Sequence, residues 1–273
     1  MLFYDQLQRS VRLPQWPPRR IVSLVPSQTE LLHYLGLEQE VVGITKFCVH
    51  PAAWYQNKAR VGGTKTLNMQ KIAALQPDLL LGNKEENEHA QIEALAGLYP
   101  VWLSDISTLD DAIDMILRIG SLTDRAAAAR DLTQGISEAF AALKIRPPVD
   151  RPAPRAAYLI WRKPYMVAAA DTFIHDMLTR LGCRNAFAER SRYPQITLAE
   201  LAEAQPEVIL LSSEPYPFAE KHFAPLQEAC PLAHIRLVDG EAFSWYGSRL
   251  LQAPAYFQKL YDGLSGPSSH QGG

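Results

Sequence analysis

The sequence is poor in cysteine, net charge and long apolar runs, and each shortage excludes a class of protein. The three cysteines, Cys48, Cys183 and Cys230, are widely spaced and odd in number, which excludes a disulfide framework and a zinc ribbon. A formal net charge of −2 provides no basic surface for nucleic acid. The longest apolar runs have the length of strands, so we expect a protein that is not embedded in a membrane.

The first residues also lack the features of a secretory signal. Met1 to Gln6 contain neither the positively charged region nor the long apolar region of a secretory signal. As written, the sequence therefore predicts a cytoplasmic protein, or a periplasmic one if a leader has been removed.

What the sequence does contain is one pattern that occurs twice. Gln76-Pro77-Asp78 and Gln205-Pro206-Glu207 lie 129 positions apart, each after a short amphipathic helix and before an unbroken apolar run. A helix halted by proline and followed by such a run is typical of a strand buried on both faces, as in a parallel sheet. Two further pairs of similar segments occur in the same order: 29–36 with 175–182, and 100–105 with 234–239. The repetition predicts two related lobes of about 130 residues each.

Strands alternate with helices through both lobes. This order predicts an α/β fold, with two Rossmann-like lobes whose sheets are mainly parallel. A hairpin is expected in Phe3 to Leu13, and Ser27 with Glu30 has the spacing of a capping box at the start of the first long helix. The alanine-rich segment from Thr123 to about Lys144 predicts one linking helix of about 30 Å. The expected domains are an N-terminal lobe at 1–122, the linking helix at 123–145, and a C-terminal lobe at 146–273. That lobe begins with a proline-rich linker at 146–154 and ends in a disordered tail from Ser265.

One opening pattern carries a resemblance to a known family. Arg20-Ile-Val-Ser-Leu-Val-Pro-Ser27, followed by Thr29-Glu-Leu-Leu and Leu35-Gly36, resembles the cobalamin, haem and ferric-siderophore binding proteins of ABC importers. These are periplasmic binding proteins with a helical backbone. Val61-Gly62-Gly63, the Gln-Pro-Asp strand and the alanine-rich helix fit the same family, so the resemblance covers almost the whole chain. It is specific for the fold and not for any ligand.

The resemblance implies two α/β lobes joined by one rigid helix, with a ligand held between the lobes at the ends of the strands. It also implies an acidic residue on each lobe that docks onto arginines of a membrane permease. Through the 129-residue offset, these acids correspond to Glu85 or Glu86 and to Glu214. Each glutamate can also simply favour the positive N-terminus of the helix that follows it.

Candidate ligand residues follow from the rule that ligands of open parallel sheets bind outside the carboxyl ends of the strands. Aromatic rings there can form flat walls for a macrocycle, and arginines can pair with its carboxylates or phosphate. The alternative is that many of these rings only pack the loops, which is at least as favoured for Phe47 and Phe243. The candidates are Ser27, Lys46, Phe47, Cys48, His50, Asn83, Lys84, Trp161, Arg162, Tyr165, Ser213, Tyr216, Trp245, Tyr246 and Arg249.

Cys48 and His50 admit two chemical interpretations. They can give a soft or imidazole ligand to cobalt or iron, but a stable protein metal site needs three or four ligands and the other histidines are scattered. His33, His89, His175 and His222 fall on expected helices and are interpreted as surface or capping residues. Cys48 can instead be the nucleophile of a thiol enzyme with His50 as its base, although no oxyanion-type glycine turn, nucleophile elbow or phosphate loop accompanies it.

The sequence therefore predicts a monomeric solute-binding protein and not an enzyme. It would have no intrinsic cofactor and would bind a bulky cobalt or iron chelate, such as a corrinoid, haem or a ferric siderophore. The paired glutamates would dock it onto an ABC permease. The alternatives are a leaderless cytoplasmic sensor or chaperone for a chelate, and the thiol enzyme.

Overall fold

The structure, a computed structural model, describes residues 1–145 and 152–265. These divide into two compact units. Unit 1 contains Met1–Ile106, Asp110–Ser137 and Trp245–Leu251, and unit 2 contains Ser107–Leu109, Glu138–Ser244 and the chain from Gln252 onward. Within the described residues, no helix combines the length and the apolar character needed to cross a membrane.

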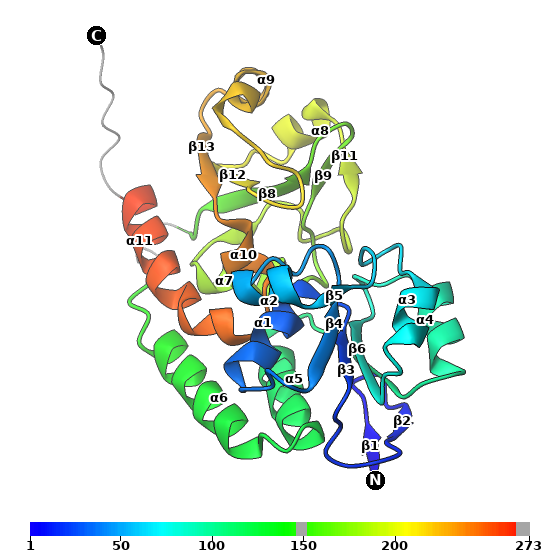
Figure 1. The fold of residues 1–273 in the computed structure, drawn as a ribbon. Helices are drawn as coiled ribbons and strands as arrows, with labels where there is room; N and C mark the ends of the chain where they lie inside the picture. The colour runs from blue at the N-terminus through cyan, green and yellow to red at the C-terminus, as the bar shows by residue number, and fades with distance from the viewer. Residues whose placement is uncertain (146–151, 266–273) are drawn as a thin grey trace. The chain divides into compact units, whose positions relative to one another are not determined.

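Unit 1 is built on a five-stranded sheet in the order β5-β4-β3-β6-β7, in which every pair of neighbours is parallel. The buried faces of β3 and β6 explain the unbroken apolar runs. In Figure 1, α3 and α4 lie together on one side of this sheet and α1 lies on the other. The strands are β3 (Ile21–Ser23), β4 (Val41–Ile44), β5 (Ala59–Arg60), β6 (Leu79–Asn83) and β7 (Val101–Ser104). The helices are α1 (Pro26–Tyr34), α2 (Ala52–Asn57), α3 (Met69–Ala74), α4 (His89–Ala96) and α5 (Leu109–Leu122).

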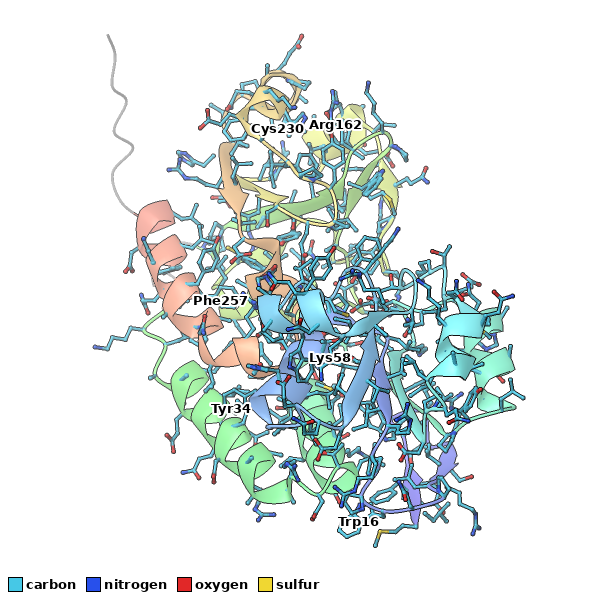
Figure 2. All side chains as sticks on the ribbon, in the orientation of Figure 1. Trp16, Tyr34, Lys58, Arg162, Cys230 and Phe257 are labelled. Atoms are coloured by element: carbon cyan, nitrogen blue, oxygen red, sulfur yellow. The ribbon has the colours of Figure 1, made fainter. Side chains whose placement is uncertain are left out.

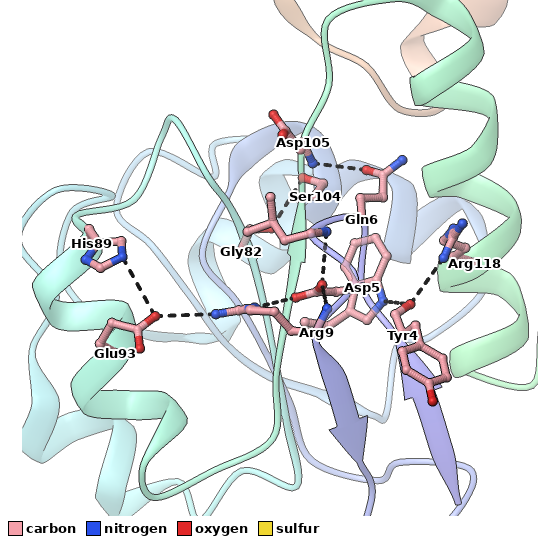
Figure 3. Close-up of polar contacts among 12 residues, drawn as sticks. Tyr4, Asp5, Gln6, Arg9, Gly82, His89, Glu93, Ser104, Asp105 and Arg118 are labelled. Carbon is pink, nitrogen blue, oxygen red and sulfur yellow. Dashed lines mark hydrogen bonds and ion pairs between the residues drawn. The ribbon is translucent and has the colours of Figure 1, made fainter.

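The predicted N-terminal hairpin is present as β1 (Leu2–Tyr4) and β2 (Ser10–Arg12), which pair antiparallel. Its turn is held by Asp5, whose side chain is fully buried and accepts hydrogen bonds from the amides of Leu7 (3.0 Å) and Arg9 (2.8 Å). The Arg9 guanidinium adds a bond of 2.8 Å to Asp5 and reaches Glu93 on α4 at 3.4 Å (Figure 3). The buried Asp5 carboxylate thus holds the turn, and the exposed Arg9–Glu93 ion pair links the turn to α4.

Unit 2 repeats the central arrangement with a different edge. Strands β8, β12 and β13 are parallel neighbours, as β3, β6 and β7 are in unit 1. At the other edge β9 pairs antiparallel with β8, and β11 pairs antiparallel with β9. The sheets are therefore mainly parallel, as predicted. The strands are β8 (Arg155–Trp161), β9 (Tyr165–Val167), β10 (Arg184–Asn185), β11 (Gln195–Ile196), β12 (Val208–Ser212) and β13 (His234–Val238). The helices are α7 (Phe173–Arg180), α8 (Leu198–Glu203), η1 (Glu220–His222), α9 (Phe223–Ala229), α10 (Gly240–Ser244) and α11 (Ala253–Ser265).

The core of unit 2 contains a cluster of aromatic rings. The Phe243 ring lies 4.9 Å from that of Tyr158 and 4.8 Å from that of Phe257, between ring centroids, and Phe257 is labelled on α11 in Figure 2. All three side chains are buried. The packing interpretation of Phe243 is therefore correct.

The duplicated pattern has the same backbone conformation in both units. Gln76 and Gln205, the residues before the two prolines, both have a φ of 44°, in the left-handed region that non-glycine residues rarely adopt. The helices α1 and α7 are likewise each followed by a glycine with positive φ, 74° at Gly36 and 76° at Gly182, which is the usual helix C-terminal cap.

The acid of each motif also accepts the same hydrogen bond, from the amide of the arginine at the start of a central strand. Asp78 accepts a hydrogen bond from the Arg20 amide at 2.9 Å, and Glu207 accepts one from the Arg155 amide at 2.9 Å. Each arginine then returns a side-chain bond to the carbonyl at the end of the preceding helix, from Arg20 to Leu75 and from Arg155 to Ala204. The motif therefore fixes the start of a central strand, β3 or β8, to the end of the helix α3 or α8. That helix precedes the neighbouring strand, β6 or β12.

The expected linking helix is shorter than predicted. α6 covers Ala126–Ala141, and α5 precedes it as a separate helix that ends at Leu122. Asp124, with a φ of 61°, lies in the turn between them. The predicted linker at 146–154 and the predicted tail from Ser265 fall largely outside the described residues.

One short segment after α10 belongs to unit 1 although the residues on both sides of it belong to unit 2. Trp245–Leu251, with the 3-10 helix η2 (Ser248–Leu251), packs against α1. Gly247 is required at this contact, because a Cβ atom there would lie 2.7 Å from the carbonyl oxygen of Ser27. The predicted domain bounds stay a prediction. They did not include the return of Trp245–Leu251 to unit 1.

Candidate functional site

The loop after β4 presents an aromatic ring at the carboxyl edge of the sheet of unit 1. Phe47 is 51% exposed, and the Lys46 Nζ lies 5.1 Å from the centroid of its ring. A tight turn, in which the Cys48 amide bonds to the Thr45 carbonyl, points Cys48 inward and Phe47 outward. The loop thus lies at the edge of the sheet that the sequence predicted, and the Phe47 ring is half exposed there.

Cys48 is not placed as a nucleophile. Its side chain is fully buried, Thr29 Oγ1 donates a hydrogen bond to its sulfur at 3.0 Å, and Thr45 Oγ1 lies 3.1 Å from it. Burial raises the pKa of the thiol, and the hydrogen bonds from the two threonines only partly oppose that rise. His50 instead packs edge-on against Trp245, with ring centroids 5.6 Å apart. The thiol-enzyme alternative is therefore wrong, since a reactive cysteine needs a lowered pKa and access to solvent.

No metal centre is formed by the side chains that the structure describes, where no group of three or more His, Cys, Asp or Glu residues is placed to hold an ion. His222 is not a surface residue, since it is buried at 5% exposure, but it is a capping residue, because its ring caps the start of η1. Its Nδ1 accepts from the Ala219 amide at 3.0 Å, so its Nε2 faces the Tyr216 hydroxyl at 3.3 Å. Burial, more than the nearby Arg162 and Lys221, lowers the pKa of His222.

The segment Trp245–Leu251 forms a compact polar group on α1. The Arg249 guanidinium lies 4.7 Å from the centroid of the Trp245 ring and pairs with the Glu30 carboxylate, which also accepts from Ser248 Oγ at 3.3 Å. The side chains of Arg249 and Glu30 are only 21% and 19% exposed. The positive charge of Arg249, a candidate for binding a ligand anion, is thus already balanced within the protein.

The predicted capping box at Ser27 and Glu30 is wrong. α1 begins two residues earlier than that cap requires, at Pro26, its N-cap is Val25, and no side chain caps it. Proline at the first helical position suits the helix because its missing N–H is one that no carbonyl would accept. Ser27 is buried at 3% exposure, and its Oγ has no hydrogen-bond partner among the described residues. A contact from Ser27 to a ligand stays a prediction.

The end of β6 uses most of its polar groups internally. Asn83 Oδ1 accepts from the amides of Glu85 (2.8 Å) and Glu86 (3.0 Å), while its Nδ2 donates to Ser104 Oγ at 3.0 Å. The Lys84 Nζ forms an ion pair of 2.7 Å with Asp105. Asn83 and Lys84 therefore shape the turn that presents the two glutamates, and their predicted contacts with a ligand have no direct support.

The glutamates predicted to dock a permease are held by hydrogen bonds. Glu86 Oε1 accepts from the Tyr246 hydroxyl at 2.7 Å within unit 1. Glu214 Oε1, at the end of β12 in unit 2, accepts from Ser244 Oγ at 2.9 Å. Sequence reasoning missed Ser244 as a partner of Glu214, because no local spacing links residues 30 positions apart.

Unit 2 presents its own aromatic group at the end of β8. Trp161 is 39% exposed, and its ring meets that of Tyr216 edge-on, with centroids 5.6 Å apart. Arg162, labelled in Figure 2, interacts with the hydroxyls of Tyr165 and Tyr216, which raise its pKa further, and its Nε is buried without a partner in the described chain. Ser213 Oγ accepts from the Gly240 amide at 2.9 Å. This arrangement suits binding of a flat or anionic molecule, and it contains no placed nucleophile and base.

Known proteins share this fold and this sequence pattern. The sequence profile of the family described as periplasmic binding protein matches residues 21–224. A vitamin B12-binding protein of Vibrio parahaemolyticus is 24% identical over 205 residues, which cover 74% of this chain and 74% of that protein. The crystal structure of the periplasmic vitamin B12 binding protein of Vibrio cholerae has a TM-score of 0.74 at 21% identity, covering 92% of this chain and 99% of that one. A periplasmic heme-binding protein in complex with two hemes has a TM-score of 0.78 at 24% identity, covering 90% and 99% of the two chains. These likenesses confirm the predicted fold class.

Proposed function

Because the chain belongs to the periplasmic binding protein family, we propose that it binds a bulky metal chelate and delivers it to an ABC importer. The chelate is a corrinoid, haem or a ferric siderophore. The family consists of binding proteins, which agrees with the prediction of a binder and not an enzyme. No observation favours the cytoplasmic sensor or chaperone.

The observation that carries the proposal is the exposed aromatic side chain at a strand end of each unit. Phe47 is 51% exposed after β4, and Trp161 is 39% exposed at the end of β8. Single exposed apolar side chains are common on protein surfaces, so the support comes from the place of these two rings, at the strand ends where ligands of parallel sheets bind. The flat faces of a corrin or porphyrin match such rings. Relatives named for vitamin B12 and heme support the same class.

Charge supports an acidic group on that ligand. No ion pair joins Arg162 to a carboxylate in the part of the chain that the structure describes, whereas Arg249 is paired with Glu30. An arginine whose neighbours are tyrosine hydroxyls can take a carboxylate or phosphate in a two-point hydrogen bond. We therefore assign Arg162, and not Arg249, to the acidic group of the chelate.

Titration of the purified full chain tests the proposal. Cyanocobalamin, haemin and ferrichrome are added in turn, and tryptophan fluorescence and the visible absorbance of the chelate are followed. We expect one of the three to bind with a Kd of about 1 µM or tighter. Trp161→Ala should weaken that binding about tenfold, because it removes one stacking face.

Trp16→Ala is the matched control, since Trp16 has a similar exposure of 42% (Figure 2). Trp16 precedes β3 and so lies on the amino-terminal side of that strand, whereas Trp161 is at the carboxyl end of β8. Binding of none of the three chelates would contradict the proposal. An equal loss of affinity in the Trp16 and Trp161 variants would contradict the assignment of the site.

The partner and the compartment follow from the same proposal. We propose that the protein acts in the periplasm and docks onto an ABC permease through Glu214 and through Glu85 or Glu86. Fractionation of the native host, with the protein detected by antibody, tests the compartment. Recovery of the protein with cytoplasmic markers would contradict it.

A further inference from the structure

Two hydrogen bonds connect one short segment to two of the three glutamates proposed to dock the permease, Glu86 and Glu214. In Ser244-Trp245-Tyr246, the Tyr246 hydroxyl donates to Glu86 Oε1 at 2.7 Å and Ser244 Oγ donates to Glu214 Oε1 at 2.9 Å. Ser244 is the last residue of α10 in unit 2, and Trp245 begins the return segment of unit 1. Each bond therefore lies inside one unit, and the two donors are two residues apart in the chain.

The main chain of each glutamate is fixed as well. Asn83 Oδ1 accepts from the Glu86 amide at 3.0 Å, and Ser212 Oγ accepts from the Glu214 amide at 3.4 Å and donates to the Glu214 carbonyl at 2.5 Å. Asn83 and Ser212 end the strands β6 and β12 at equivalent positions of the repeat. In each unit, the last strand residue therefore binds the backbone of an acid, two residues ahead at Glu214 and three residues ahead at Glu86, while the shared segment binds its carboxylate.

The contacts are of the kind that orders a side chain. An O–H···O distance of 2.7 Å to a carboxylate is near the range of charge-assisted bonds. Ser244 has one hydroxyl proton and two acceptors at 2.9 Å, Glu214 and the Gly240 carbonyl, and the charged acceptor is the stronger. Gly240 leaves the space for this acid, because a Cβ atom there would lie 2.6 Å from Glu214 Cγ.

We propose that Ser244 and Tyr246 are positioning residues that hold Glu214 and Glu86 in the conformations that dock onto the permease. The inference rests on the proposed function. A glutamate side chain has several rotatable bonds, and fixing them at the moment of docking costs conformational entropy. Holding each carboxylate beforehand removes that cost at each acid, and the donors of both bonds lie in a single stretch of chain.

Uptake by the native host tests this positioning. The chromosomal gene is replaced by each variant, and uptake is measured for whichever of cyanocobalamin, haemin and ferrichrome the purified protein binds, at a concentration that saturates every variant. We expect Tyr246→Phe and Ser244→Ala each to lower uptake about three- to tenfold, as the loss of a charge-assisted hydrogen bond would. Matched controls are Tyr34→Phe, on an exposed ring at the end of α1, and Ser137→Ala, whose hydroxyl bonds to the Thr133 carbonyl.

Double variants separate positioning from a general structural effect. If Tyr246 acts through Glu86, then Tyr246→Phe should cause no further loss in a Glu86→Ala background but a full loss in a Glu214→Ala background. Ser244→Ala should cause no further loss in the Glu214→Ala background but a full loss in the Glu86→Ala background. Gly240→Ala, which displaces Glu214 by a different route, should likewise cause no further loss beside Glu214→Ala. Thermal unfolding of each variant confirms that it is folded.

The outcomes distinguish the positioning from the proposed function. If deletion of the gene leaves uptake unchanged, the proposed function fails. If deletion abolishes uptake while Tyr246→Phe and Ser244→Ala match the wild type, the positioning is wrong and the function stands. Losses that multiply when Tyr246→Phe is combined with Glu86→Ala would also overturn the positioning.

Discussion

Replacing Arg249 with methionine removes one charge from a pair that the sequence did not predict. The Arg249 guanidinium bonds to Glu30 and lies over the Trp245 ring, and Glu30 also accepts from Ser248. Methionine keeps a flexible apolar stem against the Trp245 ring. It leaves the Glu30 carboxylate four-fifths buried, with a hydrogen bond from the Ser248 hydroxyl still in place. The change therefore tests whether Arg249 serves the fold or the ligand.

The expected loss of stability follows from the exposure of the pair. Breaking a fully buried ion pair costs about 3–5 kcal/mol, whereas an exposed pair contributes about 0–1 kcal/mol. Arg249 and Glu30 are about one-fifth exposed, and their contact is a charge-assisted hydrogen bond. We expect a loss of about 2 kcal/mol in the free energy of unfolding. For a chain of this size, that loss lowers the Tm by about 4–8 °C.

Urea unfolding followed by tryptophan fluorescence measures this loss, and the chelate titration measures any change in affinity. Arg12→Met on the exposed face of β2 is the control for losing an arginine charge. We expect Arg249→Met to bind the chelate within about twofold of wild type, because ligand recognition is assigned to Arg162. An affinity at least tenfold weaker at unchanged stability would refute the reasoning and return Arg249 to the ligand site.

Three further predictions concern the thiol, the pH dependence and the hairpin. Iodoacetamide should alkylate Cys48 about 100-fold or more slowly in the folded protein than in urea, because burial raises its pKa and blocks access, and mass spectrometry of the Cys48 peptide measures the rate; fast labelling in the folded state would contradict the buried placement. The Thr197 amide, the Arg190 guanidinium and the Thr197 hydroxyl lower the pKa of Glu200 from 4.5 to about 2. Because that pKa is lower in the folded state, the stabilisation is complete above pH 4.5 and is lost as the pH falls toward 2. The stability difference between wild type and Glu200→Gln should therefore shrink over that interval in urea unfolding, and a constant difference would contradict it. Asp5→Ala should cost about 2–3 kcal/mol, since it leaves two amides and a guanidinium without their acceptor, and hydrogen exchange should show the loss first in β1 and β2; unchanged protection there would show that the turn does not need the carboxylate.

Features set by neighbouring residues were predicted well. The two Gln-Pro-acid motifs and the strands after them have the expected structures, and the similar segments 29–36 and 175–182 both end in a glycine with positive φ. Proline halts a helix and glycine accepts a positive φ in whatever protein they occur, so these local rules can be read from the chain. The loops at the strand ends were predicted for the same reason, because parallel strands place their carboxyl ends at one edge.

Features set by distant partners were not predicted. Glu30 has the spacing of a capping residue but pairs with Arg249, more than 200 positions away, and Lys84 is neutralised by Asp105. Spacing in the sequence shows which residues share a loop. It does not show which charged residue of another helix or strand will form an ion pair with them after folding. Hence the loops that carry the candidate residues were predicted, while the ion pairs of Arg249 and Lys84 were not.

The sequence by itself determined two related α/β halves and the edges at which their strands end, because the repeat and the apolar runs are written in contiguous residues. Only the tertiary structure decided that Cys48 is inert, that Arg249 is balanced by Glu30, and that one short segment reaches both Glu86 and Glu214. Burial and pairing depend on chain segments brought together by folding, and those contacts leave no local pattern in the order of the amino acids.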